Sequence, residues 1–186
     1  MRKSTEEKAK THERIVELAS RSIREQGLDR PGVAEIMKAA GLTHGGFYKH
    51  FGSRDDLIAA ATEDAVAASD RHLHGLTDDA TDPLAAFVDW YVSAEHRDDP
   101  GAGCAVAALG GDAGRADERV RSAYRAQVER YLEDVERFLG GGEGARQRAI
   151  VAVSALVGAV VLSRAVDDEA LSDEFLDTVR EALRNG

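Results

Sequence analysis

The spacing of apolar residues is helical over almost the whole of this 186-residue chain. Along residues 120–138, for example, apolar side chains recur every three or four positions, and no segment alternates with the two-residue period of a strand. Gly27, Gly41, Pro83 and the glycine run 140–144 separate the periodic segments. The sequence therefore predicts an all-α fold of about nine helices.

Charge divides the chain into two unequal parts. Residues 1–60 contain 11 Lys or Arg and 9 Asp or Glu, which gives a net charge of +2. Residues 61–186 contain 13 Arg and 25 Asp or Glu, which gives a net charge of −12. All five lysines lie within the first 50 residues. A cap signature at Ser53 starts a long helix. We therefore predict a cationic N-terminal domain, residues 1–52, that meets a polyanion, and an acidic helical domain, residues 53–186. A chance gradient of charge along the chain is the alternative.

The composition indicates a soluble cytoplasmic protein. Cys104 is the single cysteine, which excludes an internal disulfide and suits a reducing compartment. Residues 1–10 are charged without an apolar core, so we expect no secretory signal. The longest apolar stretch, residues 149–162, is shorter than the roughly 20 residues that span a bilayer, and we expect no membrane contact.

Residues 32–51 have the spacing of a helix-turn-helix, two short helices joined by residues 41–43. Gly41 suits the left-handed position that ends the first helix. On the second helix, Phe47 and Phe51 are four residues apart and can bury together. Such a helix suits insertion into a DNA major groove, although two short helices around a glycine also occur as plain structural hairpins.

The segment from residue 27 to residue 57 carries a more specific signal. Its key stretches are Val33-Ala34-Glu35-Ile36, Ala39-Ala40-Gly41-Leu42-Thr43, Phe47-Tyr48-Lys49-His50-Phe51 and Ser53-Arg54-Asp55-Asp56-Leu57. This segment resembles the DNA-binding domain of the TetR family of transcriptional regulators. The resemblance implies an all-helical homodimer that binds a palindromic operator and represses transcription until a small ligand releases it. The remainder of the chain resembles the family in helix count, length and a hydrophobic penultimate helix.

The resemblance also assigns DNA-contacting residues. The set is Thr43, His44, Gly45, Gly46, Tyr48, Lys49, His50 and Arg54. Thr43 and Arg54 are expected on phosphates, and Tyr48 matches a tyrosine of the family that reaches the DNA. Packing beneath the helix is the alternative for His50. The chain departs from the family at Pro31-Gly32, where a capping Thr or Ser is usual, and at Met37, where a small Ala is usual.

Aromatic residues of the second domain are candidates for a pocket that binds a small apolar or aromatic effector. The set is Trp90, Tyr91, His96, Cys104, Tyr124 and Tyr131, around a glycine-rich stretch suited to a movable wall. Aromatic residues at helical spacing also form ordinary cores, so this alternative stays open. Cys104 is either a small buried residue or a sensing thiol.

The segment 145–166 carries more apolar surface than one exposed helix can leave in water. Ser154 and Gly158, four residues apart, would let two helices approach closely. We therefore predict a homodimer through residues 145–166 and 171–183 of both subunits.

Two other classes of function remain open. A helical metal-dependent hydrolase could use His72, His74, His96 and the pair Asp98-Asp99. However, the spacing of His72 and His74 cannot bring both rings to one helical face. A partner-binding module without DNA binding is the other alternative. We expect no enzyme activity, no cofactor and no metal.

Overall fold

The computed structural model describes residues 5–30 and 32–185. In these ranges the chain forms nine α-helices and one 3-10 helix, and no strand, so the predicted all-α class is confirmed. The helices are α1 Thr5–Gln26, α2 Val33–Ala39, the 3-10 helix η1 His44–Lys49, α3 Arg54–Thr77, α4 Pro83–Tyr91, α5 Ala94–Asp98, α6 Ala105–Ala113, α7 Glu118–Phe138, α8 Ala145–Ala165 and α9 Glu169–Asn185.

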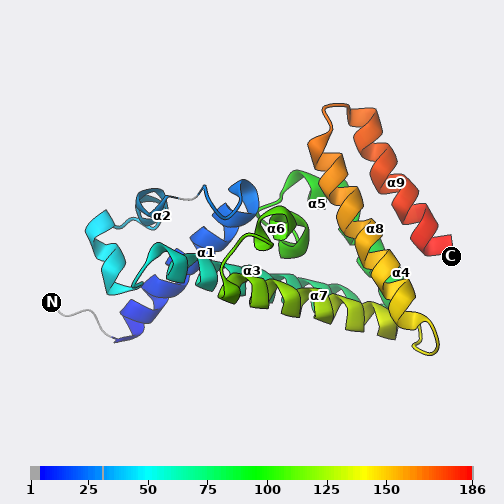
Figure 1. Ribbon diagram of the computed structural model, residues 1–186, viewed down its shortest axis with the longest axis horizontal. Coiled ribbons are helices and arrows are strands. Elements are labelled where there is room, and N and C mark those ends of the chain that lie inside the picture. The colour runs from blue at the N-terminus through cyan, green and yellow to red at the C-terminus, as the bar shows by residue number, and fades with distance from the viewer. Residues whose placement is uncertain (1–4, 31, 186) are drawn as a thin grey trace.

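Helices α1, α2 and η1 form a head at one end of the molecule (Figure 1). Ile15, Ala19 and Ile23, spaced along one face of α1, are fully buried against the other helices. The same core continues into the first half of α3 and reaches Leu109 of α6. The head therefore shares its core with the rest of the chain.

The other helices form the body, in which α3 and α7 run side by side and α8 and α9 form a hairpin at the far end (Figure 1). A second core fills the body between α4, α6, α7 and α8. Helix α6 packs against α1, α3, α7 and α8, so this short helix lies where head and body meet.

The helix expected from residue 82 to about residue 97 is broken in the structure. Helix α4 stops at Tyr91, and Val92 leaves the helical conformation with φ −101° and ψ 39°. The break has a local cause, because the Ser93 hydroxyl accepts the N–H of His96 at 3.1 Å and so caps a new helix. The last helix likewise begins earlier than Ser172, at Glu169, because Asp168 accepts the N–H of Leu171 at 2.9 Å.

Helix α8 is long and apolar enough to cross a membrane by length and composition alone. In the structure it packs against α7 and α9, and its Leu156, Ala159 and Val160 lie in the body core. The core helix of a soluble protein passes the same test of length and composition, so α8 is not a convincing membrane span.

Candidate nucleic-acid interface and its contacts with the body

The turn of the helix-turn-helix is fixed by Gly41. Its φ of +71° is left-handed, as the sequence predicts. The Gly41 N–H donates to the carbonyl of Lys38 at 2.9 Å, and the Leu42 N–H donates to that of Met37 at 2.8 Å. These two bonds are the Schellman arrangement that ends a helix. They fix where the chain leaves α2 and therefore where η1 begins.

Two phenylalanines hold η1 from behind. Phe47 and Phe51 are both buried, their ring centroids are 5.5 Å apart, and Phe51 also stacks on His12 of α1 at 4.6 Å. The second helix is a 3-10 helix rather than the expected α-helix, and its glycine pair has a low propensity for the α form. Met37, which the sequence marks as oversized, is fully buried beneath it.

The outward face of η1 carries the predicted contact residues. Tyr48 is 71% exposed, the largest exposed fraction among the large apolar or aromatic side chains described. Thr43, His44, Gly45 and Lys49 are also exposed, whereas Gly46 and His50 are half-buried. Thr43 begins η1, but its side chain makes no capping hydrogen bond, so its hydroxyl is not used to hold the helix.

The glycine pair of η1 is not required by the fold. Neither Gly45 nor Gly46 has a positive φ. A Cβ on Gly45 would meet nothing within 4 Å, and one on Gly46 would lie 3.5 Å from the Met37 methyl group, an ordinary contact. The pair therefore leaves a bare stretch of backbone beside Tyr48 that the packing of the head does not explain.

Arg54 has a positioning contact that sequence reasoning missed. Its guanidinium donates from Nη2 to the Leu28 carbonyl at 2.6 Å, and the side chain is half-buried. The bond ties the first turn of α3 to the connection between α1 and α2. A phosphate contact by Arg54 stays a prediction. Gly32 is the N-cap residue of α2 and makes no side-chain capping hydrogen bond, as expected for a glycine in place of the usual Thr or Ser. Pro31 lies outside the described residues.

Helix α1 adds basic residues to this end of the head. Lys8 and His12 lie with Lys49 and His50 around an open hollow of about 370 Å³. Sequence reasoning missed Lys8 and His12 because their nearness to η1 depends on how α1 packs. The only signal available was their spacing of four residues on one face of α1.

Five of the six residues expected to bind an effector come together in the body. The Tyr91 hydroxyl donates to the Cys104 sulfur at 3.3 Å, and the Tyr131 hydroxyl lies 3.3 Å from the same sulfur. All three are buried, and burial raises the pKa of both tyrosines well above its usual value. Trp90 stacks on His96 at 4.5 Å. These side chains fill the space between them and act as packing residues.

His96 links this cluster to α6. Its Nε2 accepts the N–H of Cys104 at 2.9 Å, so the proton resides on Nδ1, which lies 2.6 Å from the Tyr91 carbonyl. Burial lowers the His96 pKa to about 4, partly offset by that carbonyl. The neutral ring thus holds the end of α4 and the first residue before α6 together.

The loop before α6 and α6 itself contact the head. Arg24 of α1 donates to the Gly103 carbonyl at 3.1 Å, and Arg21 pairs with Asp99 at 3.0 Å. Asp112 of α6 accepts the N–H of Leu28 at 3.0 Å. Leu28 therefore donates its N–H to Asp112 of the body, and its carbonyl accepts a hydrogen bond from Arg54. These bonds join α6 and α3 to the connection between α1 and α2.

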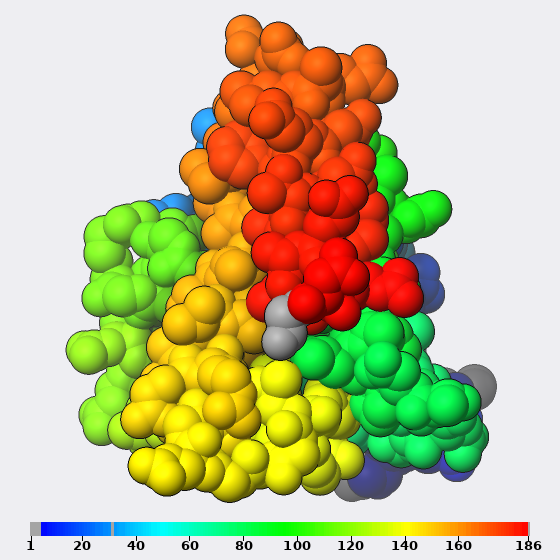
Figure 2. Space-filling model, turned by 90° about the vertical axis from the view of Figure 1, so that its right-hand side faces the viewer, coloured from blue at the N-terminus to red at the C-terminus, as the bar shows by residue number. Residues whose placement is uncertain are grey.

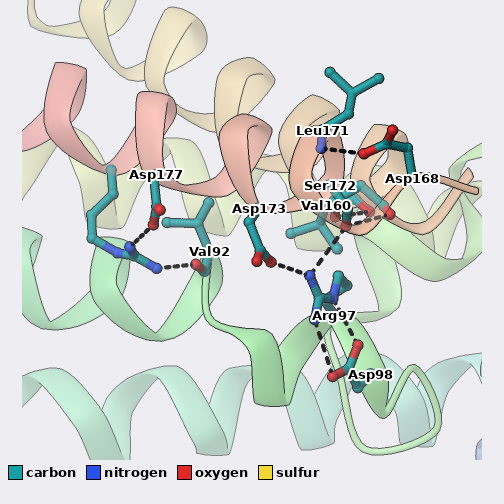
Figure 3. Close-up of polar contacts among 11 residues, drawn as sticks. Val92, Arg97, Asp98, Val160, Asp168, Leu171, Ser172, Asp173 and Asp177 are labelled. Atoms are coloured by element: carbon teal, nitrogen blue, oxygen red, sulfur yellow. Dashed lines mark hydrogen bonds and ion pairs between the residues drawn. The ribbon is translucent and has the colours of Figure 1, made fainter. Parts of the chain in front are cut away.

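A second set of contacts joins α5 to the α8–α9 hairpin (Figure 3). Arg97 donates to Ser172 at 3.1 Å and pairs with Asp173 at 2.6 Å and Asp98 at 2.7 Å. These hydrogen bonds raise the Arg97 pKa above its usual value. Arg180 of α9 bonds Asp177 and the carbonyl of Val92. The hairpin is thereby fixed to the segment that carries His96.

Tyr124, the sixth predicted effector residue, is half-buried and packs at the edge of the core that holds the cluster. Its hydroxyl donates to the Val106 carbonyl at 3.1 Å, and its ring lines a groove between α6 and α7. The residues proposed for a metal-dependent hydrolase do not form a set of metal ligands in the described part of the chain. His72 contacts Trp90 at 4.3 Å, and the described residues hold no group of three or more potential metal ligands.

Comparison with known proteins agrees with this geometry. The model for bacterial regulatory proteins of the tetR family matches residues 15–61. The HTH-type transcriptional regulator Rv0196 of Mycobacterium tuberculosis is 30% identical, covering 93% of this chain and 92% of that protein. The HTH-type transcriptional regulator TtgR of Pseudomonas putida is 33% identical over 47% of this chain and 42% of its own.

Solved structures share the whole fold. Reduced NemR of E. coli has a TM-score of 0.80 at 21% identity, with 95% of this chain and 96% of that one covered. A TetR regulator from Chloroflexus aurantiacus has a TM-score of 0.81 at 22% identity, covering 97% and 96%. The fold and its head define a helix-turn-helix transcriptional regulator. By its full-length relative, the chain belongs to the TetR family, whose members are not enzymes.

Proposed function

We propose that this protein is a cytoplasmic repressor that binds a near-palindromic operator as a homodimer and leaves it when a small effector binds. Regulators of this family bind operator DNA and form dimers. The observation that carries the proposal is the surface of η1. Two buried phenylalanines support it from behind, while Tyr48 and Lys49 face outward beside a bare glycine backbone. Side chains that meet base edges need this combination of a fixed support and an uncovered face.

The distribution of charge supports the same orientation on DNA. Lys8 and Lys49 lie at the exposed end of the head. Residues 61–186 carry 13 cationic against 25 anionic side chains, so the phosphate backbone repels the body. Repulsion of the body and attraction of the head favour one docking orientation.

The homodimer is supported by an apolar face on the α8–α9 hairpin. Its exposed large apolar residues are Ile150, Val151, Val161, Leu162 and Leu171. Ser154 is exposed and Gly158 is half-buried on the same helix. Figure 2 views the end of the molecule where α8 and α9 lie side by side. A self-complementary interface at this face would give a two-fold dimer with two recognition elements.

Control by an effector is supported by the contacts between α6 and the head. An effector that favours another position of α6 would weaken the hydrogen bond between Asp112 and Leu28. The positions of α2 and η1 relative to the body would then be less fixed. It must bind the DNA-free arrangement more tightly, and a tenfold preference corresponds to about 1.4 kcal/mol of coupling. Whether the cluster around Cys104 binds the effector stays a prediction, because its rings now have a packing role.

The test is DNA binding by two variants of the exposed face. Tyr48→Ala and Lys49→Ala should each weaken binding to the protein's own upstream DNA at least tenfold, without a marked fall in melting temperature. Loss of Lys49 should also reduce the slope of log affinity against log salt by about one unit. Fluorescence anisotropy over a salt series measures both quantities.

Arg71→Ala is the matched control, because Arg71 is exposed on α3 in the body. It should bind the same DNA like the wild type. Unchanged affinity in both head variants would contradict the assignment of η1 to the groove.

A further inference from the structure

We propose that the groove between α6 and α7 binds a small organic anion with a flat apolar part, and that this anion is the effector. The second half of the proposal rests on the proposed function, whereas the binding site stands on the groove itself. The groove is open and has a volume of about 670 Å³. The residues that line it are Gly110, Ala113, Gly114, Glu118, Arg121, Ser122, Tyr124 and Arg125.

Small residues of α6 leave the groove empty. Gly110, Ala113 and Gly114 line one wall, and none of them projects more than a methyl group. A Cβ on Gly114 would meet nothing within 4 Å, and Gly114 has an ordinary φ of −64°. The backbone conformation at Gly114 therefore does not require glycine. The missing side chain leaves room for a ligand.

Two arginines without protein partners line the opposite wall. Arg121 and Arg125 are four residues apart on α7, so their side chains lie on one face of the helix. Both are exposed, and in the described part of the chain neither guanidinium makes a hydrogen bond or an ion pair. Their neighbour Arg119, by contrast, pairs with Asp56 and Glu63. The body as a whole has a balance of −12, so two adjacent unpaired cations are a local exception.

An anion is the complement of this arrangement. Like charges at a spacing of four residues destabilise a helix by a few tenths of a kcal/mol, and one shared carboxylate or phosphate would relieve the repulsion. Arginine forms two parallel N–H···O bonds with such groups. Glu118 in the same groove disfavours a second negative group on the ligand and can accept a hydroxyl or amine proton.

The apolar part of the ligand is set by Tyr124 and Ala113. The Tyr124 hydroxyl is engaged with the Val106 carbonyl, which fixes the ring in the groove. Burial raises the Tyr124 pKa, so the phenol is neutral. A flat ring can stack on a neutral aromatic ring of fixed orientation. A single-charged aromatic acid or phosphate combines both requirements.

The groove shares a helix with the contact that holds the head. Asp112 lies between Gly110 and Gly114 on α6 and accepts the Leu28 N–H at 3.0 Å. A ligand that separates α6 from α7 therefore acts on the helix that carries Asp112. This connection makes the groove an effector site as well as a binding site.

The test compares two fluorescent probes that share one ring system. Anilinonaphthalene sulfonate carries the negative group, and N-phenylnaphthylamine does not. We expect the wild-type protein to bind the sulfonate at least tenfold more tightly. The double variant Arg121→Ala with Arg125→Ala should lose that preference, and Arg71→Ala should keep it. Equal binding of both probes to the wild type, or an unchanged preference in the double variant, overturns the site.

Gly114→Phe supplies a second test, since it fills the groove without removing charge. It should also lose sulfonate binding and keep its melting temperature. Operator affinity is measured in the same samples with and without the sulfonate. The effector role is supported if the groove variants bind the operator normally but the sulfonate no longer releases them from it. The effector role is overturned if the sulfonate still releases these variants from the operator. A wild type that binds no operator even without the probe contradicts the proposed function instead.

Discussion

His96 illustrates how one buried residue can connect parts of this molecule. Both ring nitrogens are engaged, one with the Tyr91 carbonyl and one with the Cys104 N–H. The two bonds require the neutral ring with its proton on Nδ1. A second proton would occupy Nε2 and break the bond to Cys104, the N-cap residue of α6. The protonation state of His96 is therefore tied to the position of α6.

This coupling predicts a pH dependence of stability. The His96 pKa is about 4 in the folded protein and about 6.5 when unfolded, so between these values the unfolded chain binds the extra proton. The free energy of unfolding should fall as pH falls from 6.5 to 4, by at most about 3 kcal/mol from this residue. Denaturant unfolding across this range measures the effect.

His96→Gln keeps an acceptor for the Cys104 N–H but cannot be protonated, so its stability should vary less over the same pH range. His44→Asn removes an exposed histidine and should leave the wild-type slope unchanged. The prediction is wrong if His96→Gln has the same slope as the wild type.

At the scale of elements, η1 combines residues of low helix propensity with two buried aromatic side chains. Gly45 and Gly46 disfavour a helix by roughly 1 kcal/mol each relative to Ala. The buried rings of Phe47 and Phe51 hold the segment in place instead. We propose that this arrangement serves close approach to DNA, because a side chain at Gly45 would stand on the exposed face.

Gly45→Ala should therefore separate stability from function. We expect equal or higher stability, by up to about 1 kcal/mol, together with weaker or altered operator binding, because the added methyl group projects toward the bases. Thermal unfolding and anisotropy measure the two effects. Gly75→Ala, at an exposed position inside α3, should stabilise similarly without changing affinity. Identical affinity of Gly45→Ala and wild type would contradict the close approach.

Glycine and capping residues in the sequence correctly predicted those helix ends that depend on neighbouring residues of the chain. Gly41 ends α2, and Ser53 caps α3 by accepting the Asp56 N–H at 3.0 Å, as the spacing indicates. The break at Ser93 was missed because the apolar periodicity continues through it, although the serine side chain competes for the backbone. The groove arginines were missed because their lack of partners is a property of the packed structure.

In the candidate site, too, contacts between sequence neighbours could be predicted, whereas contacts between distant residues could not. Residues 43–49 follow one another along the chain, so their shared face could be predicted from helical spacing. The bond from Arg54 to Leu28 joins residues 26 positions apart, and that from Asp112 to Leu28 joins residues 84 apart. Contacts over such separations depend on the packing of α1, α3 and α6. Periodicity carries no information about them.

For the whole molecule, the α8–α9 face predicts the oligomeric state. Val157 of α8 is half-buried and packs against the body core, so its substitution would disturb folding. Val151 is 66% exposed on the same helix. Val151→Glu should turn a micromolar dimer into a monomer and strongly weaken operator binding, because a charge would be buried without a partner.

Sedimentation velocity checks this prediction, with Thr81→Glu as a control that adds the same charge on an exposed loop. The control should remain a dimer. A wild-type protein that sediments as a monomer at micromolar concentration would refute the interface at once.

The most direct measurement of the central claim is selection of binding sites from a random pool of duplex DNA by the wild-type protein. A two-fold dimer should enrich a near-palindrome whose half-site centres lie about 34 Å apart, one turn of the duplex, or a multiple of it. Tyr48→Ala, selected in parallel, should enrich no such sequence. Enrichment of the same palindrome by both proteins, or of none by the wild type, would contradict operator recognition through η1.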